Sequence, residues 1–130
     1  MIKQNKLNYF KMIKATIKGT VPSKSNCYKV IKLGNKCSLG KSKALKDYEK
    51  SFFIQLPPAL RGLMIDGFFE FYIDVFYPSQ RSDLDNSLKG VLDCLQMTKT
   101  IKNDNKCVKI VAQKAVDKDN PRIVFEIKPL

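Results

Sequence analysis

Three aspartates and a lysine have the residue types and spacing to form a catalytic site. Asp83 and Asp85 lie two residues apart, Lys89 follows four residues after Asp85, and Asp104 comes after a further helix-length gap. Clustered carboxylates repel one another, and a hard divalent cation such as Mg²⁺ or Mn²⁺ relieves this repulsion because it prefers carboxylate and water oxygens. The spacing therefore predicts a divalent metal site with a cationic side chain beside it.

A helix is needed to position these side chains. Apolar residues recur at the spacing of one buried helical stripe, namely Leu84, Leu88, Val91, Leu92 and Leu95. Asp85 and Lys89 are one turn apart on the border of this stripe, so they are expected to point the same way. Asp83 precedes the first turn, where free backbone N–H groups and the helix dipole favour a carboxylate or a bound phosphate.

Two interpretations of the acidic residues compete with the metal site: a calcium-binding loop, and ordinary cap and turn residues. A calcium-binding loop starting at Asp83 fails, because Leu88 stands where the turn glycine is required and Cys94 where the bidentate glutamate belongs. In the other interpretation Asp83 or Asp85 is a simple helix cap and Asp104 is a turn residue, since Asp is common at both places. Spacing alone leaves this second alternative open.

The acidic pattern resembles that of the RusA family of Holliday junction resolvases. The similarity is carried by Asp83-Leu84-Asp85-Asn86, Lys89, Leu92-Asp93-Cys94-Leu95 and Asp104, and the order of elements agrees from residue 12 to residue 130. By this resemblance Asp83, Asp85 and Asp104 would bind the metal, and Lys89 would be the catalytic lysine. The sequence departs from the family pattern at Asn103, where a second acidic residue is usual, and at Met97-Thr98-Lys99-Thr100, which replaces a glycine-containing helix exit.

The same resemblance implies an activity. The expected protein is a Mg²⁺-dependent, structure-selective endodeoxyribonuclease that resolves four-way DNA junctions by paired symmetric nicks in DNA recombination and repair, with Mn²⁺ able to replace Mg²⁺. A homodimer is expected because a twofold enzyme matches a twofold junction. Two alternatives stay open: a basic DNA-binding protein without activity, in which Asn103 marks a decayed metal site, and a nuclease that acts more broadly on branched DNA.

The distribution of charge also indicates an anionic partner. The chain of 130 residues has a net charge of +12, and its first fifty residues carry thirteen lysines against only two acidic residues. Such clustered cations favour nucleic acid, although a lysine-rich surface can also serve solubility alone. The residues expected to contact DNA are Lys24, Lys29, Lys32, Lys36, Lys41, Lys43 and Asn86.

Several classes of protein are disfavoured by what the sequence lacks. It contains no histidine, and its four cysteines show no C-x-x-C spacing, which argues against a zinc site and for free thiols in a reducing cytosol. It contains no apolar run of the length of a signal peptide or a membrane span. A cytoplasmic location without membrane attachment is expected, and the small size and lysine-rich composition suit a phage or prophage protein.

The pattern of elements predicts one α/β (α+β) domain with a mixed sheet and a β-α-β-α-β-β order. Residues 1–11 are expected to be a flexible segment and residues 12–130 the folded domain. The predicted elements are strands at 13–18, 107–116 and 122–128, a central strand at 68–77 covered on both faces, and helices at 42–55 and from 85. Residues 19–42 are expected to form a long DNA-binding loop with one short strand at 28–33, and residues 117–121 to join the last two strands as a hairpin.

Overall fold

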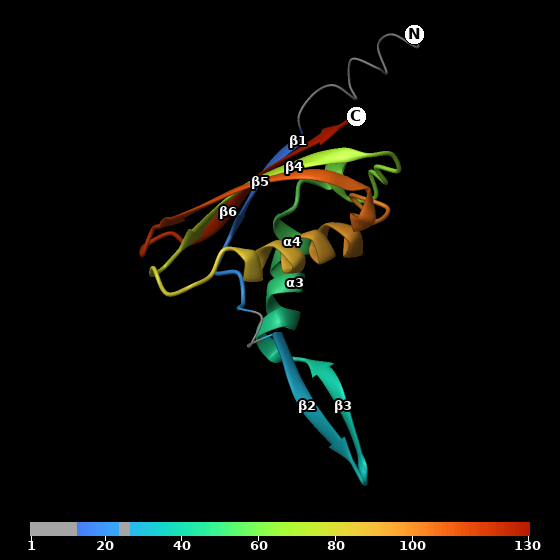
Figure 1. Ribbon diagram of the computed structural model, residues 1–130, viewed down its shortest axis with the longest axis vertical. Coiled ribbons are helices and arrows are strands. Elements are labelled where there is room, and N and C mark those ends of the chain that lie inside the picture. Colours follow the sequence, from blue (N-terminus) through green and yellow to red (C-terminus); the bar gives the residue numbers. More distant parts are fainter. Residues whose placement is uncertain (1–12, 24–26) are drawn as a thin grey trace.

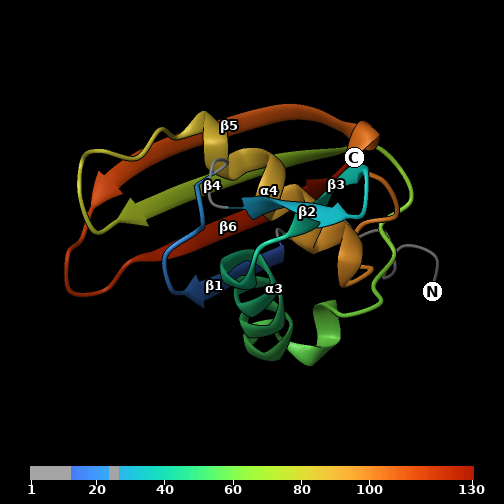
Figure 2. The same ribbon diagram turned by 90° about the horizontal axis from the view of Figure 1, so that it is seen from below.

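The computed structural model describes residues 13–23 and 27–130, apart from the side chain of Asn86. The predicted flexible segment 1–11 and Lys24 lie outside these residues. The described helices and strands of the chain are β1 (Ile13–Lys18), β2 (Tyr28–Leu33), β3 (Lys36–Lys41), α3 (Lys43–Gln55), β4 (Phe69–Tyr77), α4 (Asp85–Met97), β5 (Cys107–Val116) and β6 (Arg122–Pro129). Two 3-10 turns follow α3 and α4, namely η1 (Pro58–Leu60) and η2 (Asp104–Lys106). A mixed sheet with the order β1-β6-β4-β5 carries α3 and α4 on one face (Figures 1 and 2). The predicted α+β class is confirmed.

Helix α3 begins and ends as its sequence predicts. The Oγ atom of Ser42 accepts a hydrogen bond from the backbone N–H of Leu45 at 3.2 Å, which satisfies one of the free donors of the first turn. Phe52 is fully buried and stacks on Phe125 of β6, with ring centroids 6.1 Å apart. The Pro57-Pro58 pair follows the last turn and cannot continue the helix. No helix within the described ranges is long and apolar enough to span a membrane.

Strand β4 lies inside the sheet, but only one of its faces is buried. Phe69, Phe71 and Tyr77 alternate into the core beneath the helices, whereas Glu70 and Asp74 lie on the opposite face. The prediction that both faces are covered is wrong. The nearly continuous aromatic run conceals the alternation of a strand, in which successive side chains point to opposite faces.

Strands β5 and β6 do not pair with each other, so the predicted hairpin at 117–121 is also wrong. Strand β4 lies between them and pairs parallel with β5 and antiparallel with β6. The parallel pair is connected by the α4 crossover, as a parallel pair requires. Strand β6 also pairs antiparallel with β1, and this central place buries Ile123, Phe125 and Ile127 completely.

Most of the predicted long loop is a β-hairpin. Strands β2 and β3 pair antiparallel around Gly34-Asn35, and the φ of 62° at Gly34 is a value that favours glycine. This hairpin projects away from the sheet on the side of the helices (Figure 1). Ile31 and Gly40 are its only two described residues that are not exposed, so the hairpin is held by strand pairing rather than by a core.

Candidate active site

The turn that carries Asp83 is fixed by the end of the buried strand β4. The Tyr77 hydroxyl donates a hydrogen bond to the backbone carbonyl of Asp83 at 3.2 Å, and it forms a second, short hydrogen bond with the hydroxyl of Ser87 in α4. Both Tyr77 and Ser87 are buried. Burial raises the pKa of Tyr77, and the nearby carboxylates of Asp83 and Asp85 add to the rise. The strand, the turn and the helix are therefore joined through one phenol.

A lysine from β5 holds the same turn from the other side. The Lys114 ammonium donates hydrogen bonds to the carbonyls of Gln80 at 3.3 Å and Ser82 at 2.9 Å. This contact spans more than thirty residues of sequence, and no local pattern predicts its partners. The sequence did contain one indication of a role for Lys114. This residue interrupts the alternate apolar residues of β5, and in the structure it pairs with the buried Val75 of β4.

Asp83 and Asp85 present exposed carboxylates at the start of α4. Within residues 13–23 and 27–130, neither carboxylate makes a hydrogen bond or an ion pair. The N-cap of α4 is Leu84, and no side chain caps the helix. Simple capping therefore does not account for either aspartate. The positive end of the helix favours these two negative charges, but no described side chain pairs with them.

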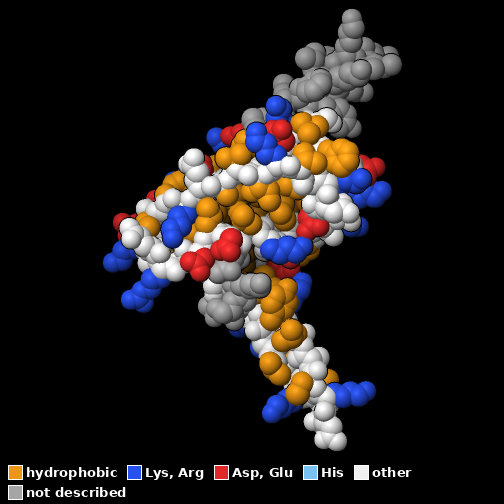
Figure 3. Space-filling model, in the orientation of Figure 1, with side chains coloured by type: hydrophobic (Ala, Val, Ile, Leu, Met, Phe, Trp, Pro, Cys, Tyr) orange, Lys and Arg blue, Asp and Glu red, His pale blue; other side chains and the backbone are white. Residues whose placement is uncertain are grey.

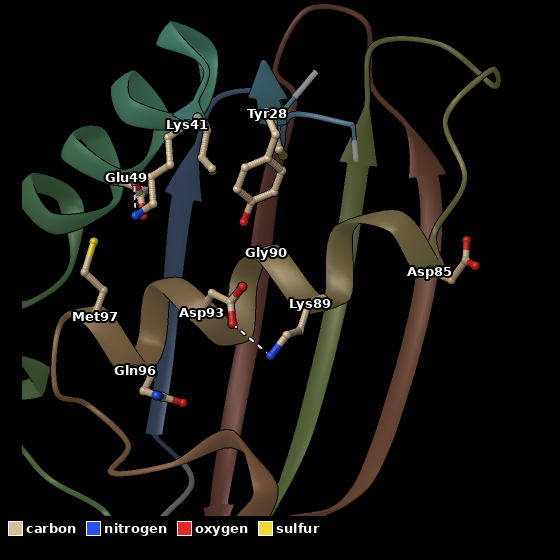
Figure 4. Close-up of a pocket in the computed structure, with 11 residues that line it drawn as sticks. Tyr28, Lys41, Glu49, Asp85, Lys89, Gly90, Asp93, Gln96 and Met97 are labelled. Atoms are coloured by element: carbon tan, nitrogen blue, oxygen red, sulfur yellow. Dashed lines mark hydrogen bonds and ion pairs between the residues drawn. The ribbon is translucent and has the colours of Figure 1, made fainter. Parts of the chain in front are cut away.

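Lys89 is paired with two other aspartates. Its ammonium lies 2.5 Å from the Asp104 carboxylate and 3.0 Å from that of Asp93. The hydrogen bond to Asp104, followed by that to Asp93, raises the pKa of Lys89 to about 12. Asp85 does not share this direction, since Figure 4 shows it pointing away at the far end of the helix. Asp85 and Lys89 border the same cleft, as their spacing predicts, but the Lys89 ammonium is grouped with Asp104 and not with Asp85.

Asp104 opens the turn η2, just past the end of α4. The Asn103 side chain accepts a hydrogen bond from the backbone N–H of Asn105 at 3.0 Å, and the backbone N–H of Asp104 donates to Gln96 Oε1 at 3.1 Å. Asn103 therefore caps the turn that presents Asp104. An asparagine makes this contact without adding a further negative charge beside Asp104.

The structure groups the acidic residues in two places. Asp83 and Asp85 lie at the start of α4, and Asp93 and Asp104 surround Lys89. In the part of the chain that the structure describes, no three Asp, Glu, His or Cys side chains gather as a set of metal ligands. The donors available at both places are carboxylate oxygens, and this donor chemistry fits a hard divalent cation.

The predicted DNA-binding lysines fall into two groups. Lys29, Lys32 and Lys36 are exposed on the hairpin and form no ion pair with any described residue. Lys41 is instead paired with Glu49 at 2.9 Å and Lys43 with Asp47 at 3.0 Å, both on α3. Figure 3 shows lysine or arginine side chains near the outer end of the hairpin. The side chain of Asn86, like the whole of Lys24, lies outside what the structure describes.

The four cysteines are free thiols, as predicted. Cys94 is buried in α4, and burial raises its pKa to about 12, with a smaller contribution from the charge of Glu49. A thiol with this pKa stays protonated at neutral pH and is a poor nucleophile. Cys94 is part of the core rather than of the site.

A basic chain with exposed carboxylates at a helix start and a permanently charged lysine nearby has the features of a nuclease. Over residues 3–128 the chain matches the model of the family described as Endodeoxyribonuclease RusA, and it belongs to that family. Enzymes of this family are divalent-metal-dependent endodeoxyribonucleases that resolve Holliday junctions, so the chain is an endonuclease whose substrate is branched DNA. The resemblance deduced from the acidic pattern is confirmed. No curated protein matches the sequence.

Proposed function

We propose that this endonuclease uses Mg²⁺, with Mn²⁺ as a substitute, to make paired symmetric nicks in four-way junctions during DNA recombination and repair. The observation that carries this proposal is the pair Asp83 and Asp85, exposed and without a side-chain partner among the described residues, in the anchored turn between β4 and α4 and at the start of α4. These carboxylates are open to solvent and make no ion pair with any described residue, so their oxygens are available to a divalent cation, which prefers carboxylate ligands.

Asp83, Asp85 and Asp104 are the residues that would hold the metal. A bound Mg²⁺ would supply an activated water and stabilise negative charge on the phosphoryl and leaving oxygens. The ion pair between Asp104 and Lys89 has to loosen for Asp104 to join Asp83 and Asp85. The scissile phosphate offers Lys89 a new anionic partner, so substrate binding can release Asp104.

Lys89 acts in this scheme as a fixed positive charge. Because its pKa is about 12, it stays protonated at neutral pH and cannot accept a proton from water. Its ammonium instead orients the scissile phosphate and offsets the charge that develops in the transition state. Asp93, 3.0 Å away, keeps the lysine in place after Asp104 is released.

The hairpin supplies the sequence-independent part of DNA binding. Lys29, Lys32 and Lys36 are free to contact phosphates, and each contact releases condensed counter-ions. Lys41 and Lys43 contribute less, because each first has to leave a carboxylate partner. Lys24 and Asn86 remain proposed contacts on grounds of sequence alone.

A homodimer would supply the two active sites that paired nicking needs. Each chain carries one Asp83–Asp85 pair and one Lys89, which is enough for one strand. Two copies related by a twofold axis would cut opposite strands of a twofold junction at matching positions.

The test is cleavage of a four-way junction, a flap and a linear duplex of matched sequence, with Mg²⁺, Mn²⁺ or EDTA. The proposal predicts nicks at matching positions in two opposite strands of the junction, present with either metal and absent in EDTA. Equal cutting of the flap would indicate a broader branched-DNA nuclease. Tight junction binding without cutting under either metal would contradict the proposed metal chemistry.

A further inference from the structure

A cleft beside the candidate active site has the shape and chemistry to take a nucleobase. It lies between the base of the β2–β3 hairpin, α3 and α4, and its volume is about 510 Å³. Asp85 and Lys89 line it together with Tyr28, Lys41 and Gly90, so it is continuous with the proposed catalytic residues (Figure 4). A volume of this size is typical of small-molecule sites.

Gly90 keeps the α4 side of the cleft open. It stands inside a helix, where glycine is less stable than alanine because it loses more conformational freedom. Its φ is not positive, and a Cβ atom built on it would meet no described atom within 4 Å outside the neighbouring residues and the helix backbone. Neither backbone strain nor close packing therefore requires glycine here. Because Gly90 has no side chain, a ligand in the cleft can approach the backbone of α4.

Tyr28 provides an aromatic surface on the opposite side. The residue is 49% exposed, and Figure 4 shows its side chain pointing from the hairpin base toward α4, where Gly90 lies. The hydroxyl makes no hydrogen bond to any residue that the structure describes. An exposed aromatic ring across from a bare stretch of helix suits a flat, apolar group, and nucleobases stack on such rings whatever their sequence.

The two lysines of the cleft are each paired with a carboxylate that also lines it. Lys41 is held by Glu49 and Lys89 by Asp93, so both ammonium groups are fixed in position while remaining partly exposed, and the cleft carries no net positive charge. The cleft therefore suits the uncharged base of a nucleotide, with the phosphate outside it at Lys89. A base that is stacked inside an intact duplex cannot enter the cleft. At the crossover of a junction a base has already lost part of its stacking, so less free energy is needed to move it out of the helix and into the cleft.

We propose that the cleft binds one unstacked nucleobase of the cleaved strand between Tyr28 and Gly90, next to the phosphate held by Lys89. This inference rests on the proposed function, because it assigns the neighbour of the scissile phosphate. It also gives the enzyme a way to recognise a branched structure. Only DNA that can release a base near the cut fills the cleft.

The test compares binding to four-way junctions that carry single abasic sites at successive positions around the crossover, in EDTA. For the native chain, an abasic site at one position is expected to weaken binding about tenfold, the loss of one stacked base. Tyr28→Ala should bind the intact junction about tenfold more weakly and show no further loss at that position. Tyr28→Phe should behave as the native chain, and so should Tyr72→Ala on the outer face of the sheet.

Gly90→Leu separates ligand binding from folding. Leucine favours helix, and a Cβ atom at this position meets no described atom within 4 Å outside the neighbouring residues and the helix backbone, so the melting temperature should stay equal or rise. The same substitution should fill the cleft and abolish sensitivity to the abasic site. Equal binding to all abasic junctions by the native chain, or continued sensitivity in Tyr28→Ala, would overturn the inference. Cleavage of the intact junction with Mg²⁺ is scored separately, so failure of the proposed function would show there instead.

Discussion

The turn between β4 and α4 and the hairpin β2–β3 have opposite constructions. The turn is anchored by buried groups, since Tyr77 and Ser87 join it to the core and Lys114 binds its carbonyls. The hairpin has almost no buried side chain and carries three lysines without carboxylate partners among the described residues. The difference fits two tasks. Catalytic groups require fixed geometry, whereas phosphate contacts tolerate movement because they act mainly through charge.

Replacing Lys89, in the helix that follows the anchored turn, should have the largest effect on the rate of cleavage. Lys89→Met is expected to lower the rate of junction cleavage by about 10²–10³, the usual cost of one lost transition-state contact. Junction binding in EDTA should change far less, because one phosphate contact is lost among several. Rates come from single-turnover cleavage with Mg²⁺. Lys102→Met, an exposed lysine in a weak ion pair with Asp66, serves as the control and should cut normally.

Changes on the hairpin should act on binding and leave the rate of cutting intact. Replacing Lys29, Lys32 and Lys36 together by Gln is expected to weaken junction binding about tenfold or more and to reduce the slope of log K against log[salt] by about two to three. At saturating DNA and enzyme, the single-turnover cleavage rate should stay near the native value.

The matched control neutralises Lys14, Lys109 and Lys128 on the outer face of the sheet. It removes the same charge, so an equal loss of affinity would show that total charge, and not the hairpin, determines binding. Five of the six lysines are exposed and Lys128 is half-buried on the outer face of the sheet, so neither triple variant should change the free energy of unfolding by more than about 1 kcal/mol.

The anchoring of the turn can be tested with one hydroxyl. Tyr77→Phe removes the donor to the Asp83 carbonyl and leaves the buried Ser87 hydroxyl without this partner. The free energy of unfolding should fall by about 1 kcal/mol, and the cleavage rate should fall several-fold because Asp83 is less well held. Denaturant melts and single-turnover rates measure the two effects. Tyr72→Phe is the control, and a rate loss of equal size there would contradict the assignment.

The last effect appears only at alkaline pH and leaves cleavage at neutral pH unchanged. Burial raises the pKa of Cys94 from 9.0 in the unfolded chain to about 12 in the folded one, so the folded state retains the thiol proton that the unfolded state loses. This stabilisation is complete below pH 9 and is lost as the pH rises toward 12, with a slope of about 1.4 kcal/mol per pH unit. Cys94→Ala should flatten that slope in urea melts. The exposed Cys37→Ala should not.

The sequence predicted elements better than their pairing. Helices α3 and α4 were located correctly because a buried stripe, a serine cap and a proline stop are local signals. The position of β6 between β1 and β4 was missed, because the turn at 117–121 shows that the chain reverses but not which strand it will join. The contact of Lys114 with the turn before α4 was missed for the same reason, as it depends on tertiary structure.

The candidate site shows the same limit. The spacing of Asp83, Asp85 and Lys89 predicted a helix that carries the last two, and the structure places Asp85 and Lys89 in α4 with Asp83 just before it. The spacing of these residues did not show that Lys89 pairs with Asp93 and Asp104, because the position of Asp104 depends on the path of the chain after α4. Two acidic groups lie close to one lysine, and this ion pairing decides the direction of its side chain.

The central claim is that Asp85 holds the metal used for junction cleavage. Its most direct test is the cleavage of a four-way junction by the native chain, Asp85→Asn and Asp66→Asn, with Mg²⁺ or EDTA. Native and Asp66→Asn chains should make symmetric nicks with Mg²⁺ and none in EDTA, while Asp85→Asn should bind the junction normally and not cut it. Cutting by Asp85→Asn at the native rate would contradict the account.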